Sequence, residues 1–262
     1  MRYVAKELRD TADISSGQGN QLVEFFRLIS IALVVIISLY LITNLATEYF
    51  VSNISIENEK RWFGKIPFPE IDTLESTEEH KRVKQILHRL VQNPQVPKLD
   101  FQIFIIDESE INAFAFPGGR IGITRGLLEE IDDELALAFV IGHELGHFKF
   151  RHHLKSLSRS LSLSLSISII FGNSSDLNLT ENMLLLLETR HSRKQESESD
   201  FFAAELVYSS YGKTDNIDQL FQILKQKNKD KIALPFLSTH PSDETRIKQL
   251  NQYISKLKEM NP

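Results

Sequence analysis

Apolar residues form one long continuous run near the N-terminus of the chain. The run LISIALVVIISLYLITNL covers residues 28–45 and has no charge between Arg27 and Glu48. Eighteen uncharged residues are enough for a helix that crosses a bilayer. The polar stretch before the run is too long for a signal peptide, so we expect the run to remain as an anchor. The pattern predicts a polar tail over 1–22, a transmembrane anchor over 23–47, a linker over 48–75 and a folded domain over 76–262.

Basic residues precede the anchor, namely Arg2, Lys6, Arg9 and Arg27, whereas Glu48, Glu57 and Glu59 follow it. Positive charge favours the cytoplasmic side of a membrane. We therefore expect a single-pass membrane protein that contacts the lipid bilayer and has its folded domain outside the cytoplasm.

The folded domain combines helical and strand-like patterns. Residues 80–92 form an amphipathic helical pattern, in which we place His80 and His88 on the surface. Three strand-like pieces follow at 101–107, 111–116 and 120–124, with a Pro-Gly-Gly turn at 117–119. Helical patterns return at 132–148, 181–211 and 242–257. We expect a mainly helical α+β fold with a small β-sheet.

Two pieces of this pattern have more than one interpretation. The pieces 111–116 and 120–124 predict a hairpin, whose free edge could pair with an extended peptide or could simply cover a helix. The stretch LSLSLSISIIFG at 161–172 alternates as a strand does, but it could also be a helix, lie at the membrane surface or stay mobile. Its twelve residues are too few to cross a bilayer.

The helical stretch at 132–148 carries the chemistry. His143 and His147 are four residues apart, so a helix places both imidazoles on one face, where they can bind one Zn²⁺. Glu144 can reach a water on that metal without being a ligand, which is the HExxH arrangement. Asp132 and Asp133 supply a helix N-cap. Gly142 and Gly146 suggest that a neighbouring backbone or a substrate strand comes close.

A catalytic zinc with two histidines commonly takes one carboxylate as its third ligand. We choose Glu196, because Asp200 lies one turn later and can support a ligand by hydrogen bonding, whereas Glu198 lies on another face. His240 precedes the last helix and could stabilise an oxyanion, contact the metal or act as a cap. Arg246 could hold an acidic group near the site or be solvated.

Composition and charge limit the possible metal ligands and partners. The chain has no cysteine, so a zinc site must use histidine and carboxylate. The net charge of −5 argues against nucleic acid as a partner. Arg151, His152 and His153 follow the HExxH helix, and we place them at its C-terminus or on the surface rather than among the ligands.

Four motifs occur in the order found in one superfamily: NAFAFPGGRIGITRGLL (112–128), HELGHFKFRH (143–152), SRKQESESD (192–200) and STHPSDETR (238–246). Over roughly residues 75–260 the chain resembles the HtpX-like and CAAX-prenyl-endopeptidase superfamily of membrane-associated zinc metallopeptidases. The resemblance implies ligands at His143, His147 and Glu196, a base at Glu144 and a supporting acid at Asp200. Ser199 stands where the family has alanine. Because this chain has one clear span where typical members have several, it resembles more closely the single-span quality-control members or the mitochondrial inner-membrane type.

These observations predict a membrane-anchored endopeptidase with one Zn²⁺ per chain that acts on misfolded or membrane-associated polypeptides. Glu144 would take a proton from the attacking water. A membrane-bound chaperone or adaptor with a structural zinc is the alternative, against which Glu144 argues because a structural site needs no base. A third interpretation is a peptidase held inactive by the long insertion between His147 and Glu196.

Overall fold

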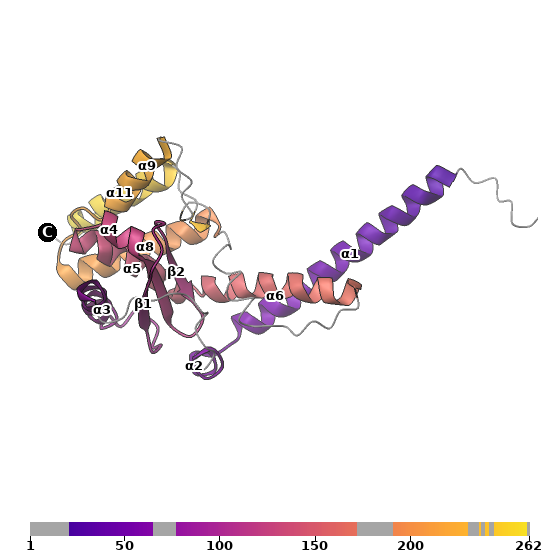
Figure 1. Ribbon diagram of the computed structural model, residues 1–262, viewed down its shortest axis with the longest axis horizontal. Coiled ribbons are helices and arrows are strands. Elements are labelled where there is room, and N and C mark those ends of the chain that lie inside the picture. Colours follow the sequence, from indigo (N-terminus) through magenta and orange to yellow (C-terminus); the bar gives the residue numbers. More distant parts are fainter. Residues whose placement is uncertain are drawn as a thin grey trace, which may run out of the picture.

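A computed structural model describes residues 21–64, 77–171, 191–229, 236, 239–240 and 244–260. A helical body holds a small sheet, and a long arm extends from it (Figure 1). The mainly helical α+β class predicted from the sequence is confirmed. The predicted tail lies almost wholly outside the described residues, and the predicted domain boundaries remain predictions.

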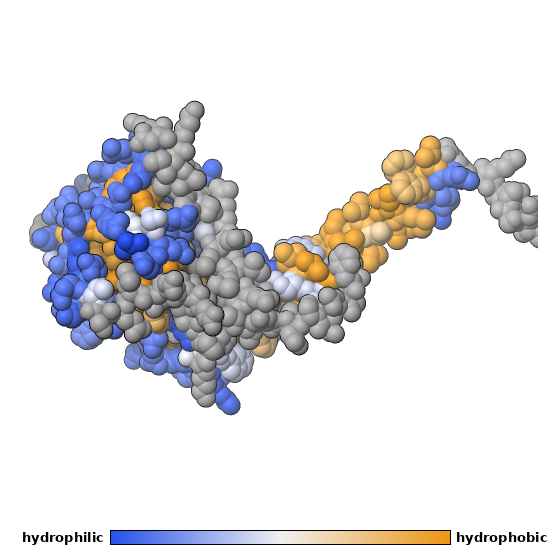
Figure 2. Space-filling model, viewed as in Figure 1, coloured by the Kyte–Doolittle hydropathy of each residue, from blue (hydrophilic) through white to orange (hydrophobic). Residues whose placement is uncertain are grey.

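The arm consists mainly of α1 (Gln21–Ser52), which contains the apolar run. Its side chains are exposed along most of its length and give the arm a hydrophobic surface (Figure 2). A helix of 32 residues is about 48 Å long, more than the roughly 30 Å of a bilayer's hydrocarbon core. This is the one helix among the described residues that is long and apolar enough to cross a membrane.

The range predicted as a linker contains the end of α1 and a short helix, α2 (Ile56–Phe63). Ser55 caps α2 by accepting a hydrogen bond from the Asn58 amide. Glu59 on α2 is buried, and its Oε1 accepts hydrogen bonds from His153 Nε2 at 2.8 Å and from the Gly118 amide at 3.3 Å. The chain between anchor and body is therefore docked against the body over these residues. Residues 65–76 lie outside the described part.

The sheet described here has three strands in the order β1 (Gln102–Ile106), β3 (Arg120–Thr124), β2 (Ala113–Phe116). β1 runs parallel to β3, and β2 runs antiparallel to it, so the predicted hairpin is confirmed. Gly118 and Gly119 make the turn with φ near +87° and +85°, a backbone conformation that favours glycine. α4 (Arg125–Glu130) follows β3 directly.

α3 (Glu78–Leu90) packs against β1 and against α5 (Glu134–Lys149), with Val83, Ile86, Leu87 and Leu90 in the core. The prediction that His80 lies on the surface is wrong. Its side chain is buried, and its Nε2 lies 3.1 Å from the Ile103 carbonyl oxygen, because an imidazole can enter the core where an acceptor is available. His88 is exposed, as predicted.

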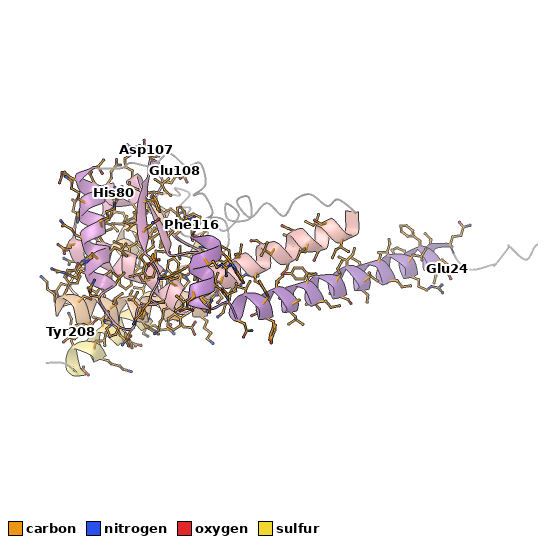
Figure 3. The ribbon with its side chains drawn as sticks, turned by 90° about the horizontal axis from the view of Figure 1, so that it is seen from below. Glu24, His80, Asp107, Glu108, Phe116 and Tyr208 are labelled. Atoms are coloured by element: carbon orange, nitrogen blue, oxygen red, sulfur yellow. The ribbon has the colours of Figure 1, made fainter. Side chains whose placement is uncertain are left out.

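The ambiguous stretch 161–172 lies, except for Gly172, in α6 (His152–Phe171). Alternating serines also recur every four residues, which places Ser158, Ser162 and Ser166 on one helix face, where each of the last two donates to the carbonyl four residues earlier. α6 leaves the body and runs beside α1 (Figure 3).

The remaining helices described are α8 (Arg193–Tyr211), α9 (Gln219–Lys229) and α11 (Glu244–Met260). The helix predicted over 181–211 starts only at Arg193, where Ser192 caps it, and residues 181–190 lie outside the described part. The helix predicted over 242–257 is described from Glu244 onward. On α11, Leu250 is buried, and the side chains packed partly buried against the core are those of Ile247, Tyr253, Ile254 and Leu257.

Candidate metal centre

α5 is buried on nearly all sides and carries His143, Glu144 and His147. The side chain of Asp133 caps its first turn by accepting hydrogen bonds from the amides of Leu135 and Ala136. Of the two predicted N-cap candidates, Asp133 is the N-cap residue. The buried position means that the three side chains are held by packing rather than by solvent-exposed loops.

α8 lies against α5 at very close range and brings in the carboxylates. A Cβ built on Gly146 would lie 2.8 Å from the Ser199 Cα, and one built on Gly142 would lie 3.3 Å from the Ala203 Cα. Of the two interpretations of the glycines, the structure supports the approach of a neighbouring backbone. A capping box between Ser192 and Gln195 starts α8, and Glu196 follows Gln195 directly.

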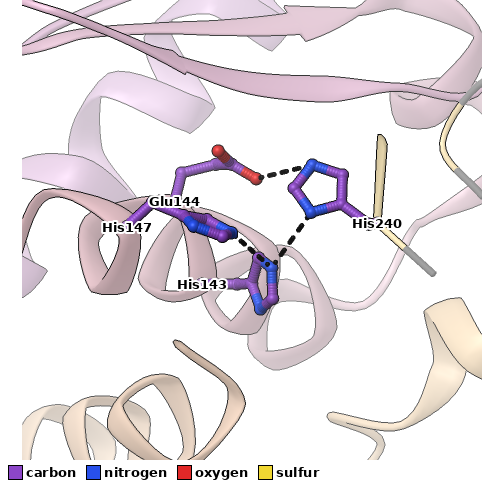
Figure 4. Close-up of side chains that lie close together, drawn as sticks. All are labelled: His143, Glu144, His147 and His240. Carbon is purple, nitrogen blue, oxygen red and sulfur yellow. Dashed lines mark hydrogen bonds and ion pairs between the residues drawn. The ribbon is translucent and has the colours of Figure 1, made fainter. Parts of the chain in front are cut away.

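Ligand atoms of four side chains cluster at this junction: Nε2 of His143, Nε2 of His147, the carboxylate oxygens of Glu196 and Nδ1 of His240. The two imidazole atoms lie 3.0 Å apart, and each lies 3.5 Å from a Glu196 oxygen. His240 Nδ1 lies 3.3 Å from His143 Nε2 and 3.2 Å from each Glu196 oxygen (Figure 4 shows the histidines). Zinc bonds of about 2.0–2.1 Å in a tetrahedron separate ligand atoms by roughly 3.3 Å. The cluster therefore fits such an ion.

Asp200 and Arg246 support the cluster from behind. Asp200 Oδ1 lies 2.9 Å from His143 Nδ1, the nitrogen on the far side of the ring from the cluster. Arg246 is buried, donates to both oxygens of Asp200 and pairs with Glu196 through Nη1 at 2.7 Å. The hydrogen bond predicted for Asp200 is present. Of the two options for Arg246, the structure has the one in which it holds acidic groups.

The charges of the site set its pKa values. Burial opposes ionisation of Glu196, but His240 and Arg246 hold the pKa of Glu196 well below its usual range. Burial also disfavours a charged His143, yet the carboxylates of Asp200 and Glu196 raise the pKa of His143 to about 9. A site that holds a proton this firmly has a net attraction for positive charge, which a divalent cation would also satisfy.

Glu144 differs from the other two carboxylates. It is completely buried, and among the described residues neither of its oxygens has a hydrogen-bond partner. Burial raises the pKa of Glu144, whereas His240 and His143 lower it to a smaller extent. A carboxylate without a hydrogen-bond partner beside a metal-ligand cluster is placed to exchange protons with a molecule that enters the site.

His240 also meets the edge of the sheet. Its Nε2 lies 3.4 Å from the carbonyl oxygen of Ala113 on β2 and 3.8 Å from Glu144 Oε1. The three roles considered from the sequence were oxyanion stabilisation, metal contact and a cap, and this position beside the ligand atoms favours the first two.

Three histidines of the site were misplaced or missed. His152 and His153 were predicted at a helix C-terminus or on the surface, but they begin α6 and are buried. His152 Nδ1 lies 3.0 Å from His147 Nδ1, and His153 Nδ1 lies 3.2 Å from the His147 carbonyl. The reason is a sharp break at Arg151, with φ of 59°, which turns α6 back against α5.

His191 was missed altogether. Its ring stacks on His147 with 4.1 Å between centroids, and its ligand atoms fall in a second group with His147, Glu196 and His240. Burial lowers the pKa of His191 to about 2, so it is neutral at ordinary pH. The available signal was its place next to Ser192, the residue that caps the ligand-bearing helix.

The fold and this cluster together define a metallopeptidase. A family model for peptidase family M48 matches residues 77–254, and the chain belongs to that family.

Known relatives agree with this assignment. The chain is 28% identical to the mitochondrial metalloendopeptidase OMA1 of Arabidopsis thaliana over 59% of this chain and 32% of the relative. It is 27% identical to the Schizosaccharomyces pombe protein of the same name over 66% of this chain and 52% of the relative. A putative beta-barrel assembly-enhancing protease of Vibrio cholerae is 29% identical over 61% of this chain and 36% of the relative. The aligned part of this chain thus spans about a third to a half of each of these relatives.

Proposed function

We propose that this protein is a membrane-anchored zinc metalloendopeptidase whose general base is Glu144. The observation that carries the proposal is the buried Glu144 carboxylate, which has no hydrogen-bond partner among the described residues and lies beside the converging ligand atoms of His143, His147 and His240. A structural zinc site needs no such group. The membrane-bound chaperone or adaptor with a structural zinc is therefore the weaker alternative.

His143, His147 and Glu196 would hold one Zn²⁺, with Asp200 orienting His143 through its Nδ1. The chain offers nitrogen and oxygen donors and no thiolate, which suits the catalytic type of zinc site. When bound, zinc lowers the pKa of a water ligand to about 7 and polarises a carbonyl group.

Glu144 would accept a proton from the water that attacks the scissile carbonyl carbon. It would then donate that proton to the amide nitrogen as the carbon–nitrogen bond breaks. The products are a carboxylic acid and an amine, which together ionise to a carboxylate and an ammonium group. Burial, by raising the pKa of Glu144, brings its proton affinity closer to that of the water it must deprotonate.

His240 would act as a removable fourth group. Its Nδ1 completes the tetrahedral set, whereas a catalytic site keeps one position for water. Turnover then requires His240 to move away from the other three ligands. The protein would rest in a closed state, as in the interpretation of a peptidase held inactive, with His240 as the closing group. Residues 172–190 of the insertion before Glu196 lie outside the described part of the chain.

The substrate would bind along β2. This strand is at the edge of the described sheet, and its first residue, Ala113, lies next to His240. An extended polypeptide that pairs with a free strand edge would pass directly over Glu144. We assign misfolded or membrane-associated proteins as the substrate class, because α1 would hold the site near a bilayer, with the body outside the cytoplasm, and because relatives are named as mitochondrial metalloendopeptidases or a beta-barrel assembly-enhancing protease.

The proposal is tested with purified full-length Glu144→Gln protein, which removes the base but keeps the size of the side chain. We expect casein cleavage to fall by about 10²- to 10⁴-fold, because the proton transfers are lost. Zinc content, measured by mass spectrometry, should stay at one ion per chain. Cleavage at the wild-type rate would overturn the mechanism, and wild-type protein that neither cleaves nor responds to a chelator would favour the chaperone alternative.

A second variant, His240→Ala, tests the closed resting state in the same assay. We expect the rate per bound zinc to equal or exceed that of the wild type, because three ligands remain and the fourth position is open. A fall of about 10²-fold would instead show that His240 mainly stabilises the oxyanion.

A further inference from the structure

α6 leaves the catalytic body in contact with the anchor α1 over much of its length. Thr47 is opposite Ser162, and Thr43 is opposite Ser166, so the two helices run antiparallel. Figure 3 shows both helices projecting from the same side of the body, with Glu24 near the distant end of α1.

Beyond a buried apolar cluster next to the body, hydroxyl groups join the described parts of the two helices. Thr43 Oγ1 and Ser166 Oγ are 2.9 Å apart, Thr47 Oγ1 and Ser162 Oγ are 2.5 Å apart, and Ser158 Oγ donates to Thr47 Oγ1 at 3.1 Å. The hydroxyls also bond to carbonyls of their own helices. Small hydroxyl residues that satisfy one another between helices are typical of contacts inside membranes.

The opposite face of α6 is apolar and uncovered in the described part of the chain. Leu163 and Ile167 on this face are 54% and 48% exposed, and Ile169 near the end of α6 is 58% exposed. In water, such a helix would turn its serines outward and its large side chains inward. α6 has the reverse arrangement, which suits a surrounding of hydrocarbon.

Charged residues end at the same level on both helices. Arg159 is the last charge on α6, and residues 160–171 are uncharged. Glu48 is the first charge after the apolar run of α1, one residue beyond Thr47. Because Thr47 is opposite Ser162, these two charges lie at nearly the same height. Both line a hollow of about 430 Å³, together with Lys155 and Lys194. We expect these charged residues to lie at the membrane surface, among the lipid headgroups.

We propose that residues 160–171 of α6 insert beside α1 into the same bilayer. Twelve helical residues extend about 18 Å, roughly half of a 30 Å hydrocarbon core, so the segment enters the membrane without crossing it. The inference rests on the membrane placement of α1 in the proposed function. It goes beyond that placement by making the anchor a pair of helices, the second of which starts at the catalytic site.

The second helix would set the height of the site above the membrane. His152, the first residue of α6, touches His147, and seven residues separate it from Arg159. Seven residues of helix correspond to about 10 Å. The ligand cluster would therefore lie close to the lipid headgroups, and the substrates would be polypeptide segments that border the membrane.

The absence of cysteine from the chain permits a direct test. Single-cysteine variants of the full-length protein carry a nitroxide label in phosphatidylcholine and phosphatidylglycerol vesicles, and relaxation by oxygen is compared with relaxation by a water-soluble nickel complex. Ile167→Cys probes α6. Ile42→Cys is the matched control on α1, because the pairing places Ile42 at the height of Ile167 and it is 64% exposed. His88→Cys on α3 is the reference for water.

We expect the oxygen-to-nickel ratio at position 167 to match that at 42 and to exceed that at 88 several-fold. A ratio at 167 like that at 88 would overturn the insertion, and exclusion of both reagents would show that protein rather than lipid covers α6. An oxygen-to-nickel ratio at position 42 like that at position 88 would show that α1 is not in the membrane. That result would overturn the proposed anchor and therefore also the insertion of α6. Casein cleavage by the same variants reports independently on the proposed catalytic function.

Discussion

Two pairs of helices in this protein pack through small side chains spaced by four residues, α5 with α8 and α1 with α6. In the body, Gly142 and Gly146 let the backbones of α5 and α8 come together, and the groups gathered there are charged. In the arm, the serines and threonines of the two helices contact one another, and these groups are uncharged. The large apolar side chains point into the core in the first pair and outward in the second.

The difference shows how surroundings decide what a small-residue stripe does. In the body, excluded water makes burial of the apolar side chains favourable, so close approach can be used to bring histidines and carboxylates within ligand distance. In the arm, apolar side chains can remain outside only if the surroundings are themselves apolar, so hydroxyl pairs are left to join the helices. The body should therefore be sensitive to charge and shape, and the arm only weakly sensitive to loss of one hydroxyl.

The largest effect on stability is expected for Arg246→Met. The change leaves the buried carboxylates of Asp200 and Glu196 without their guanidinium partner, and breaking a buried pair costs about 3–5 kcal/mol. Arg125→Met is the matched control, because Arg125 also pairs with two carboxylates but is about half exposed, and we expect a loss of at most about 1 kcal/mol. Thermal unfolding in detergent measures both, and equal losses would contradict the assignment of a charge-dependent core.

Gly146→Ala should have the next largest effect. The new methyl group would lie 2.8 Å from the Ser199 Cα, so α8 must shift, and overpacking of this kind costs about 1–3 kcal/mol. Zinc binding should weaken as well, because Glu196 moves with α8.

Gly142→Ala provides the comparison on the same helix face. Its methyl group would lie 3.3 Å from the Ala203 Cα, and the gain in helix propensity, about 1 kcal/mol, should offset most of the contact. Calorimetry and zinc titration of the two variants would refute the close-approach argument if Gly142→Ala were the more damaging change.

The smallest effect is expected in the arm, for Ser162→Ala. Loss of one hydroxyl pair between membrane helices costs about 0.6 kcal/mol on average. A double-mutant cycle that combines Ser162→Ala with Thr47→Val isolates the interaction free energy of the two hydroxyl groups. The stability of α6 in each variant is measured by hydrogen exchange of its backbone amides. If Ser162→Ala has the same effect in both backgrounds, the Thr47–Ser162 contact contributes nothing. Casein cleavage should be unchanged, because neither hydroxyl touches the metal centre.

Local pattern was enough to predict the anchor helix, the hairpin, the HExxH helix and the choice of Glu196, Asp200 and His240 as members of one site. The helices and the hairpin depend on spacing within a helix or on turn chemistry at Pro117–Gly119, both of which are visible in a short window of sequence. The choice of Glu196 also needed the HExxH pair upstream, and His240 was chosen for its place just before the last helix. The catalytic and ligand roles of these residues remain predictions that the variants above test. Burial of His80, His152 and His153 could not be read in the same way, because it depends on acceptors supplied from elsewhere in the chain.

By itself, the sequence determined which side chains can take part, since helical periodicity places His143 beside His147 and Glu196 beside Asp200 whatever else the chain does. Only the tertiary structure decided that α8 lies against Gly146, that His240 lies beside His143 and Glu196, and that α6 runs beside α1. Those outcomes depend on contacts between segments far apart in the chain, whose free energies are set by backbone approach, burial and charge together and therefore have no signature in any one segment.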